Sequence, residues 1–166
     1  SDIVTDSLTA FGMKAKDSGR FADVLAQTSS KANTDVRGLG EAFKYAAPVA
    51  GALGYTVEDT SIAIGLMSNA GIKGEKAGTA LRTMFTNLAK PTKAMKDKME
   101  ELGISITDSN GKMLPMRDVM GQLRDKFKGL SKDQQASAAA TIFGKEAMSG
   151  ALAVINASDA VSYTHL

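Results

Sequence analysis

The sequence predicts an all-α fold, namely a compact multi-helix bundle of about eight short helices with one small β-hairpin around residues 104–114. Three observations over the 166 residues lead to this prediction. Apolar residues recur at spacings of three and four, which places them along one face of a helix. Glycines and capping residues interrupt these apolar stripes at short intervals, where helices should end. The long heptad repeats of a coiled coil are lacking.

The first part of the chain is predicted to be helical. Apolar stripes cover residues 21–28 and 36–47, and each indicates one amphipathic helix. Pro48 follows the second stripe and should kink or break that helix, because proline cannot donate a backbone hydrogen bond. Thr56, with Asp59 three residues later, resembles a capping box that begins the next helix.

The glycine-rich stretch "NAGIKGEKAGTALR" at residues 69–82 has two competing interpretations, a phosphate-binding loop or a corner between two helices. A P-loop needs G-x-x-x-x-G-K-[ST] after a buried strand. Gly78 is not followed by lysine, and no βαβ pattern surrounds the stretch. The helical corner is therefore favoured, with Gly71 ending one helix and Gly74 or Glu75 beginning the next.

Gly78 is then expected inside a helix, where glycine costs about 1 kcal/mol relative to alanine. We interpret it as the mark of another backbone that passes close by. The same helix should bury an apolar stripe made of Ala77, Leu81, Met84, Phe85 and Leu88.

The stretch "GISITDSNGKMLP" at residues 103–115 departs from helical periodicity. Ile104 and Ile106 alternate with polar residues, and Asn110-Gly111 follows. Asn-Gly is a strong hairpin signal because both turn residues then take positive φ. We therefore predict a small two-stranded ribbon that lies on the helices, since such a ribbon is marginal alone.

The C-terminal third returns to helical spacing. Apolar stripes cover residues 116–127 and 148–155, and Ser131 with Gln134 has the pattern of a capping box between them. These signals predict the remaining helices of the bundle.

The composition argues against an enzyme. The chain has no cysteine, which excludes thiolate nucleophiles, disulfides and cysteine-based zinc sites. Its single histidine, His165, is the second-last residue, a poor place for a catalytic base. No metalloprotease, EF-hand or nucleophile-elbow motif is present. We expect no enzymatic activity and no catalytic, cofactor-binding or metal-binding residues.

Charge and hydropathy exclude two further classes of binding protein. The net charge is +2 with both signs interspersed, which is no electrostatic footprint for specific nucleic-acid binding. The longest uncharged stretches have 13 residues, whereas a transmembrane helix needs about 18 or more. We therefore expect no transmembrane segment in this chain.

Four stretches, taken in order, resemble the conserved core region of phage tail tape measure proteins, a family of minor tail proteins. Residues 21–54 resemble the opening helices of that family, and residues 69–91 its Gly-Glu-x-x-Gly-Thr-x-Leu-Arg corner. Residues 102–123 resemble its short ribbon and following helix, and residues 138–155 its Ile-Phe-Gly turn. The resemblance assigns structural signature residues, namely Gly71, Gly74, Gly78, Leu81, Asn110, Gly111, Phe143 and Gly144.

This resemblance implies a structural component of a phage or prophage tail, part of a tape measure protein that sets tail length and supports tail assembly. The implied partners are the tail tube protein, tail assembly chaperones and tail-tip or baseplate proteins, and we also expect self-association. The implied locations are the virion tail and, during assembly, the host cytoplasm. The alternative is a membrane-active helical protein that perturbs the bacterial envelope.

The chain is expected to contain one module. Residues 1–158 should form a helical tape measure core module, and because the chain starts with serine we expect a longer parent protein. The final "VSYTHL" does not continue the pattern. Residues 159–166 are therefore interpreted as an unstructured or artefactual tail.

Overall fold

The computed structural model describes residues 2–157, and within them the fold is all-α. Nine α-helices and one 3₁₀-helix follow one another in that part, where about eight helices were expected. Their bounds are α1 (Asp2–Ala10), η1 (Ala15–Asp17), α2 (Ser18–Lys31), α3 (Val36–Ala52), α4 (Val57–Asn69), α5 (Gly74–Ala89), α6 (Lys93–Leu102), α7 (Met116–Phe127), α8 (Lys132–Phe143) and α9 (Met148–Ile155). The predicted tail at 159–166, with His165, lies outside the described residues.

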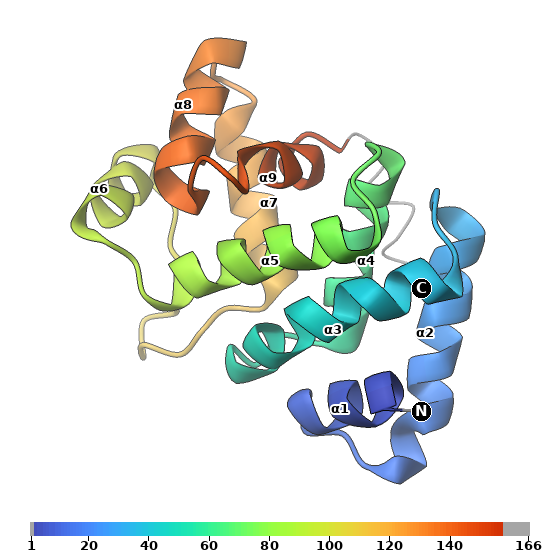
Figure 1. Ribbon diagram of the computed structural model, residues 1–166. Coiled ribbons are helices and arrows are strands. Elements are labelled where there is room, and N and C mark those ends of the chain that lie inside the picture. Colours follow the sequence, from blue (N-terminus) through green and yellow to red (C-terminus); the bar gives the residue numbers. More distant parts are fainter. Residues whose placement is uncertain (1, 158–166) are drawn as a thin grey trace.

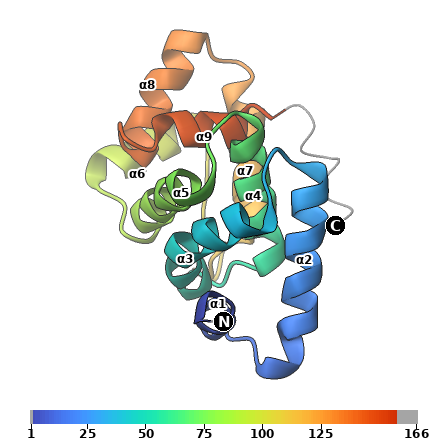
Figure 2. The same cartoon turned by 45° about the vertical axis from the view of Figure 1, so that its right-hand side comes forward.

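Helices α3 and α5 run side by side through the middle of the molecule (Figure 1). The blue helices α1 and α2 lie on the α3 side, while α6, α8 and α9 lie on the α5 side (Figure 2). Helix α4 contacts α2 and α3 as well as α5, α7 and α9. Helix α4 thus packs against helices from both the N-terminal and the C-terminal parts of the described chain.

Aromatic rings mark the centre of the core. Five of the six phenylalanines are fully buried: Phe21, Phe43, Phe85, Phe127 and Phe143. The rings of Phe11 and Phe21 both meet Phe43 edge-on, with centroids 6.0 and 5.2 Å away. Such edge-to-face pairs are favourable beyond the area they bury, and these two hold the N-terminal helices on α3.

Two helical glycines lie where backbones pass very close to one another. A Cβ atom on Gly78 in α5 would be 2.9 Å from Ala42 Cα and 3.0 Å from the Ala42 carbonyl carbon in α3. A Cβ on Gly51 in α3 would be 2.6 Å from the carbonyl carbon of Ala10 at the end of α1. The close passage predicted at Gly78 is therefore present, and Gly51 makes a similar one on the other face of α3.

The predicted β-hairpin at residues 104–114 is wrong. No β-strand occurs between residues 2 and 157, and the segment holds only one isolated antiparallel bridge, between Thr107 and Met113. Its turn is built around Asp108, whose carboxylate accepts hydrogen bonds from the backbone N–H groups of Asn110 and Lys112, both at 2.9 Å. Gly111 has a φ of 80°, but Asn110 does not have a positive φ. The turn is thus different from the one that Asn-Gly predicts.

The two arms pair with each other only around this bridge, where the Asp108 N–H donates to the Lys112 carbonyl at 2.8 Å and the Leu114 N–H donates to the Ile106 carbonyl at 2.9 Å. The backbone N–H and C=O of Ser105 pair with the side-chain amide of Gln122 on α7, both at 2.8 Å. The second arm stops at Pro115, which has no N–H and caps α7. The ladder cannot lengthen beyond this bridge, because Met116 already begins α7.

Pro48 does not break α3, which continues through it to Ala52, and the alternative of a kink stays a prediction. Proline removes the hydrogen bond to the carbonyl of Lys44 four residues earlier. Both Pro48 and Lys44 are exposed. Water can therefore satisfy that carbonyl, and the remaining turn of α3 stays helical.

Candidate functional site

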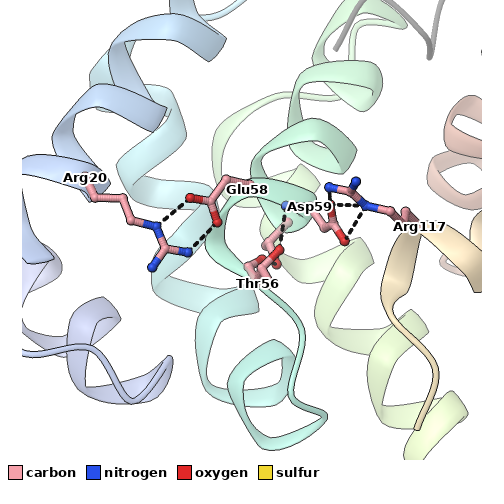
Figure 3. A network of polar contacts seen from close by, with 6 residues as sticks. Arg20, Thr56, Glu58, Asp59 and Arg117 are labelled. Carbon is pink, nitrogen blue, oxygen red and sulfur yellow. Dashed lines mark hydrogen bonds and ion pairs between the residues drawn. The ribbon is translucent and has the colours of Figure 1, made fainter. Parts of the chain in front are cut away.

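The N-terminus of α4 carries two adjacent carboxylates, Glu58 and Asp59, in its first turn. Thr56 caps the helix, and its hydroxyl accepts a hydrogen bond from the backbone N–H of Asp59 at 3.1 Å. Negative charge is favourable at this end of a helix because of the helix dipole. Figure 3 shows the two carboxylates pointing in opposite directions, toward arginines on different helices.

Glu58 pairs with Arg20 of α2. Nε and Nη2 of Arg20 donate to the two carboxylate oxygens, each at 2.6 Å. These hydrogen bonds lower the pKa of the Glu58 carboxyl below its ordinary value of 4.5, although partial burial acts in the opposite direction. The Glu58 side chain is 27% exposed and that of Arg20 50% exposed. The pair is therefore partly hydrated.

Asp59 pairs with Arg117, the second residue of α7. Nη2 of Arg117 donates to Oδ1 at 2.8 Å, and Nε lies at 3.2 and 3.4 Å from the two oxygens. The Asp59 side chain is only 6% exposed, whereas that of Arg117 is 62% exposed. A buried carboxylate thus depends on an arginine that reaches in from the surface.

A small apolar hollow lies beside this second ion pair, between α4, α7 and α9. Its volume is about 140 Å³. It is lined by Asp59, Ile62, Ala63, Leu66, Met116, Arg117, Met120, Arg124 and Val154. Most of these side chains are apolar, so the hollow offers contacts to an apolar group with charged residues at its edge.

Arg124 is the unusual member of this lining. Its Nη2 donates to the main-chain oxygen of Val154 at 3.1 Å, near the C-terminus of α9. Its Nε atom is buried and has no hydrogen-bond acceptor among the described residues. Burial lowers the pKa of this guanidinium from its ordinary value. Arg124 is thus a partly buried cation without an ion-pair partner among the described residues.

The signature residues of the predicted corner lie where the sequence places them. Gly71 follows α4 with a φ of 89°, and Gly74 begins α5 with a φ of 55°. Gly78 and Leu81 are buried on α5. The stretch is a helical corner, with α4 before it, so a phosphate loop after a strand is excluded.

The other signature residues lie in two different places. Asn110 and Gly111 belong to the turn before α7, and Phe143 and Gly144 end α8. The side chain of Asn87 donates to the Phe143 carbonyl at 2.7 Å and so holds this end of α8 against α5. The structure does not bring these signature residues together into one site, and their status as a family signature stays a prediction.

Sequence reasoning missed the charged residues around α4. The sequence indicates Asp59 only as the partner of Thr56 in a capping box and assigns no role to Glu58. Their partners Arg20 and Arg117 are 38 and 58 residues away along the chain. Arg124 carried no signal at all, because an exposed basic residue in the last turn of a helix is ordinary.

Comparison with known proteins decides the family. The model of the family described as "Phage-related minor tail protein" matches residues 1–144. The chain belongs to the phage-related minor tail protein family. The phage tail resemblance seen in the sequence is thereby confirmed.

Two curated relatives of this minor tail protein are named for tape measurement. The chain is 42% identical over 157 residues to the tape measure protein of Pneumococcus phage Dp-1, and 34% identical over 152 residues to the probable tape measure protein of Escherichia phage P2. These alignments cover 95% and 90% of the chain but only 14% and 19% of the relatives. The chain therefore spans less than a fifth of either relative. No solved structure matches it significantly.

No single helix within residues 2–157 combines the length and apolar content needed to cross a bilayer. Helices α8 and α9 meet the criterion only when taken together, and they are bent by 116° at the break between them.

Proposed function

We propose that this chain is a compact structural module of a tape measure protein, the tail component that sets tail length and supports tail assembly. The observation that carries the proposal is the 42% identity over 95% of the chain to the tape measure protein of phage Dp-1. The module acts through protein–protein contacts and catalyses no reaction. Its proposed extent is residues 1–158.

The proposed partners follow from this role. They are the tail tube protein, the tail assembly chaperones and the tail-tip or baseplate proteins, together with further copies of the same protein. The module resides in the virion tail, after a period in the host cytoplasm during assembly. No cofactor is required for such a role.

The fold supports a module rather than a ruler. A ruler measures distance through an extended chain, and an α-helix advances 1.5 Å per residue. Here nine helices reverse direction repeatedly within residues 2–157. We infer that this region organises or anchors the tape measure protein, while extended regions elsewhere in that protein set the length.

The experiment is an in-frame deletion of codons 2–157 in the phage that encodes this chain, followed by electron microscopy of the tails. A ruler of this length would shorten the tail by about 230 Å. We expect instead a loss of complete tails, with any that form keeping their normal length. An equal deletion outside this region is the control and should shorten the tail by that amount.

Two results would contradict the proposal. Normal yields of tails shortened by about 230 Å would make the region a ruler. Infectious phage with unchanged tails would mean that the region has no structural role in the tail.

A further inference from the structure

We propose that the hollow between α4, α7 and α9 is a socket for one apolar side chain from a helix elsewhere in the same tail protein. A carboxylate on that helix, about one turn from the apolar side chain, pairs with Arg124. The inference rests on the proposed function, since it requires that the module belongs to a longer protein.

The size of the hollow fixes how much it can hold. A dry apolar cavity of about 150 Å³ binds benzene, and the hollow here is of similar volume at about 140 Å³. Its walls include Ile62, Leu66 and Met120, whose surfaces are apolar. One leucine, methionine or phenylalanine side chain is therefore the appropriate occupant.

The charged residues at the edge of the hollow indicate which charged group the partner helix should carry. Asp59 and Arg117 already neutralise each other there. Arg124 also lines the hollow, but it has no ion-pair partner among the described residues, and its one hydrogen bond goes to a neutral carbonyl. A carboxylate is the acceptor that suits an unpaired guanidinium best.

The smallness of the contact indicates where the partner comes from. Stable complexes between separate proteins bury about 1,200–2,000 Å², far more than one side chain and one ion pair provide. A segment on the same polypeptide binds at a high effective concentration, so that a weak contact is enough. The two curated relatives extend far beyond this region, which covers 14% and 19% of them.

A second copy of this module is a poorer occupant. Across residues 2–157, Val36 is the one large apolar residue classed as exposed, at 51%. The neighbouring carboxylate of Asp35 is already used, because it accepts a hydrogen bond from the Gly38 N–H at 2.7 Å. The module thus presents no apolar side chain with a free carboxylate one helical turn away at that position.

The test places a photo-cross-linking residue, p-benzoylphenylalanine, at the half-buried Ile62 in the wall of the hollow, in the full-length protein within assembled tails. The control carries it at Lys132, which is exposed at the start of α8. Mass spectrometry identifies the linked peptides. We expect Ile62 to link to a helical segment of the same protein outside residues 1–166 that contains Asp or Glu. Lys132 should not form that link.

Two substitutions then probe the chemistry of the socket. Arg124→Gln should lower the yield of the Ile62 cross-link by about fivefold or more, while Lys128→Gln, an exposed residue outside the lining, should leave it unchanged. Ala63→Met fills the hollow from α4 and should abolish the link. Melting temperatures of the 166-residue variants establish that each is folded, and Ala63→Met should melt no lower than the parent if it fills empty space.

The outcomes separate the socket from the proposed function. Tails of normal length in which Ile62 links no more than Lys132 would overturn the socket alone. A link to another tail protein, or to residues 1–166 of a second copy, would also overturn it. Absence of the protein from purified tails would overturn the proposed function and the socket together.

Discussion

Gly78 shows how one residue determines the spacing of two helices. Because its missing Cβ lets the α3 backbone at Ala42 come close, Gly78→Ala should destabilise the protein although alanine is the better helix former. Overpacking of this kind costs about 1–3 kcal/mol, so the melting temperature should fall by roughly 2–12 °C. Gly78→Leu should lower it much further. Circular dichroism during heating measures the change.

A second glycine provides the matched control. Gly121 also lies inside a helix, α7, but a Cβ there would meet nothing within 4 Å. Gly121→Ala should therefore raise the free energy of unfolding by up to about 1 kcal/mol. If Gly78→Ala is tolerated as well as Gly121→Ala, the tight crossing of α5 on α3 does not exist in solution.

At the residue scale, the close helix contact at Gly78 was predictable from the sequence, whereas the one at Gly51 was not. Gly78 stood out because it follows two turn glycines and then interrupts a clear apolar stripe. Gly51 is in an equally close contact, with Ala10, but it lies in "APVAGALG", where the residue on either side of it is alanine. A sequence shows that a glycine is costly in a helix, whereas only the fold shows which backbone it faces.

At the scale of elements, α4 joins helices from both ends of the chain through its two ion pairs. They occupy adjacent positions but differ in burial, with Asp59 at 6% exposed and Glu58 at 27%. Arg117→Ala would leave a buried carboxylate unpaired, at a cost of about 1–3 kcal/mol. Arg20→Ala would leave one that water can reach, at a cost below about 1 kcal/mol. Urea denaturation of the two variants measures both costs.

The pH dependence provides a control on this comparison. The pKa of Glu58 is lowered in the folded state, chiefly by the hydrogen bonds from Arg20. Its contribution to stability is therefore present above the ordinary value of 4.5 and is lost as the pH falls through the lower folded-state pKa. The difference between Arg20→Ala and the parent should shrink in acid. Equal costs for the two arginines at neutral pH would contradict the ranking by burial.

Elements were predictable where local sequence decides them. The stripe and the glycines placed α5, and the Ser131 capping box with Gln134 is present at the start of α8. The hairpin failed because the next helix begins too soon. Its second arm ends at Pro115, where α7 starts, so pairing stops around the bridge between Thr107 and Met113. Asn-Gly indicates a turn but not how far the arms beside it will pair.

At the scale of the whole molecule, the fold class was predictable and the hollow beside α4 was not. The spacing of apolar residues and the glycines at helix ends are properties of each helix alone. They are enough to predict a bundle of short helices. The hollow requires α4, α7 and α9 to meet, and its lining spans Asp59 to Val154. No local pattern encodes a meeting of segments so far apart in the chain.

A folded bundle and an extended helix of the same residues would differ in overall size. A compact chain of 166 residues should have a radius of gyration of about 15 Å. The same residues in a single helix would extend over roughly 250 Å. Small-angle X-ray scattering of the dilute 166-residue chain distinguishes the two, and a concentration series separates self-association from extension. A radius above about 30 Å at the lowest concentration would mean that the reversals at Gly54, Gly71 and Gly103 do not hold the helices together. The region could then add to the measured tail length as an extended helix does, because only a folded bundle keeps these residues from contributing to that length.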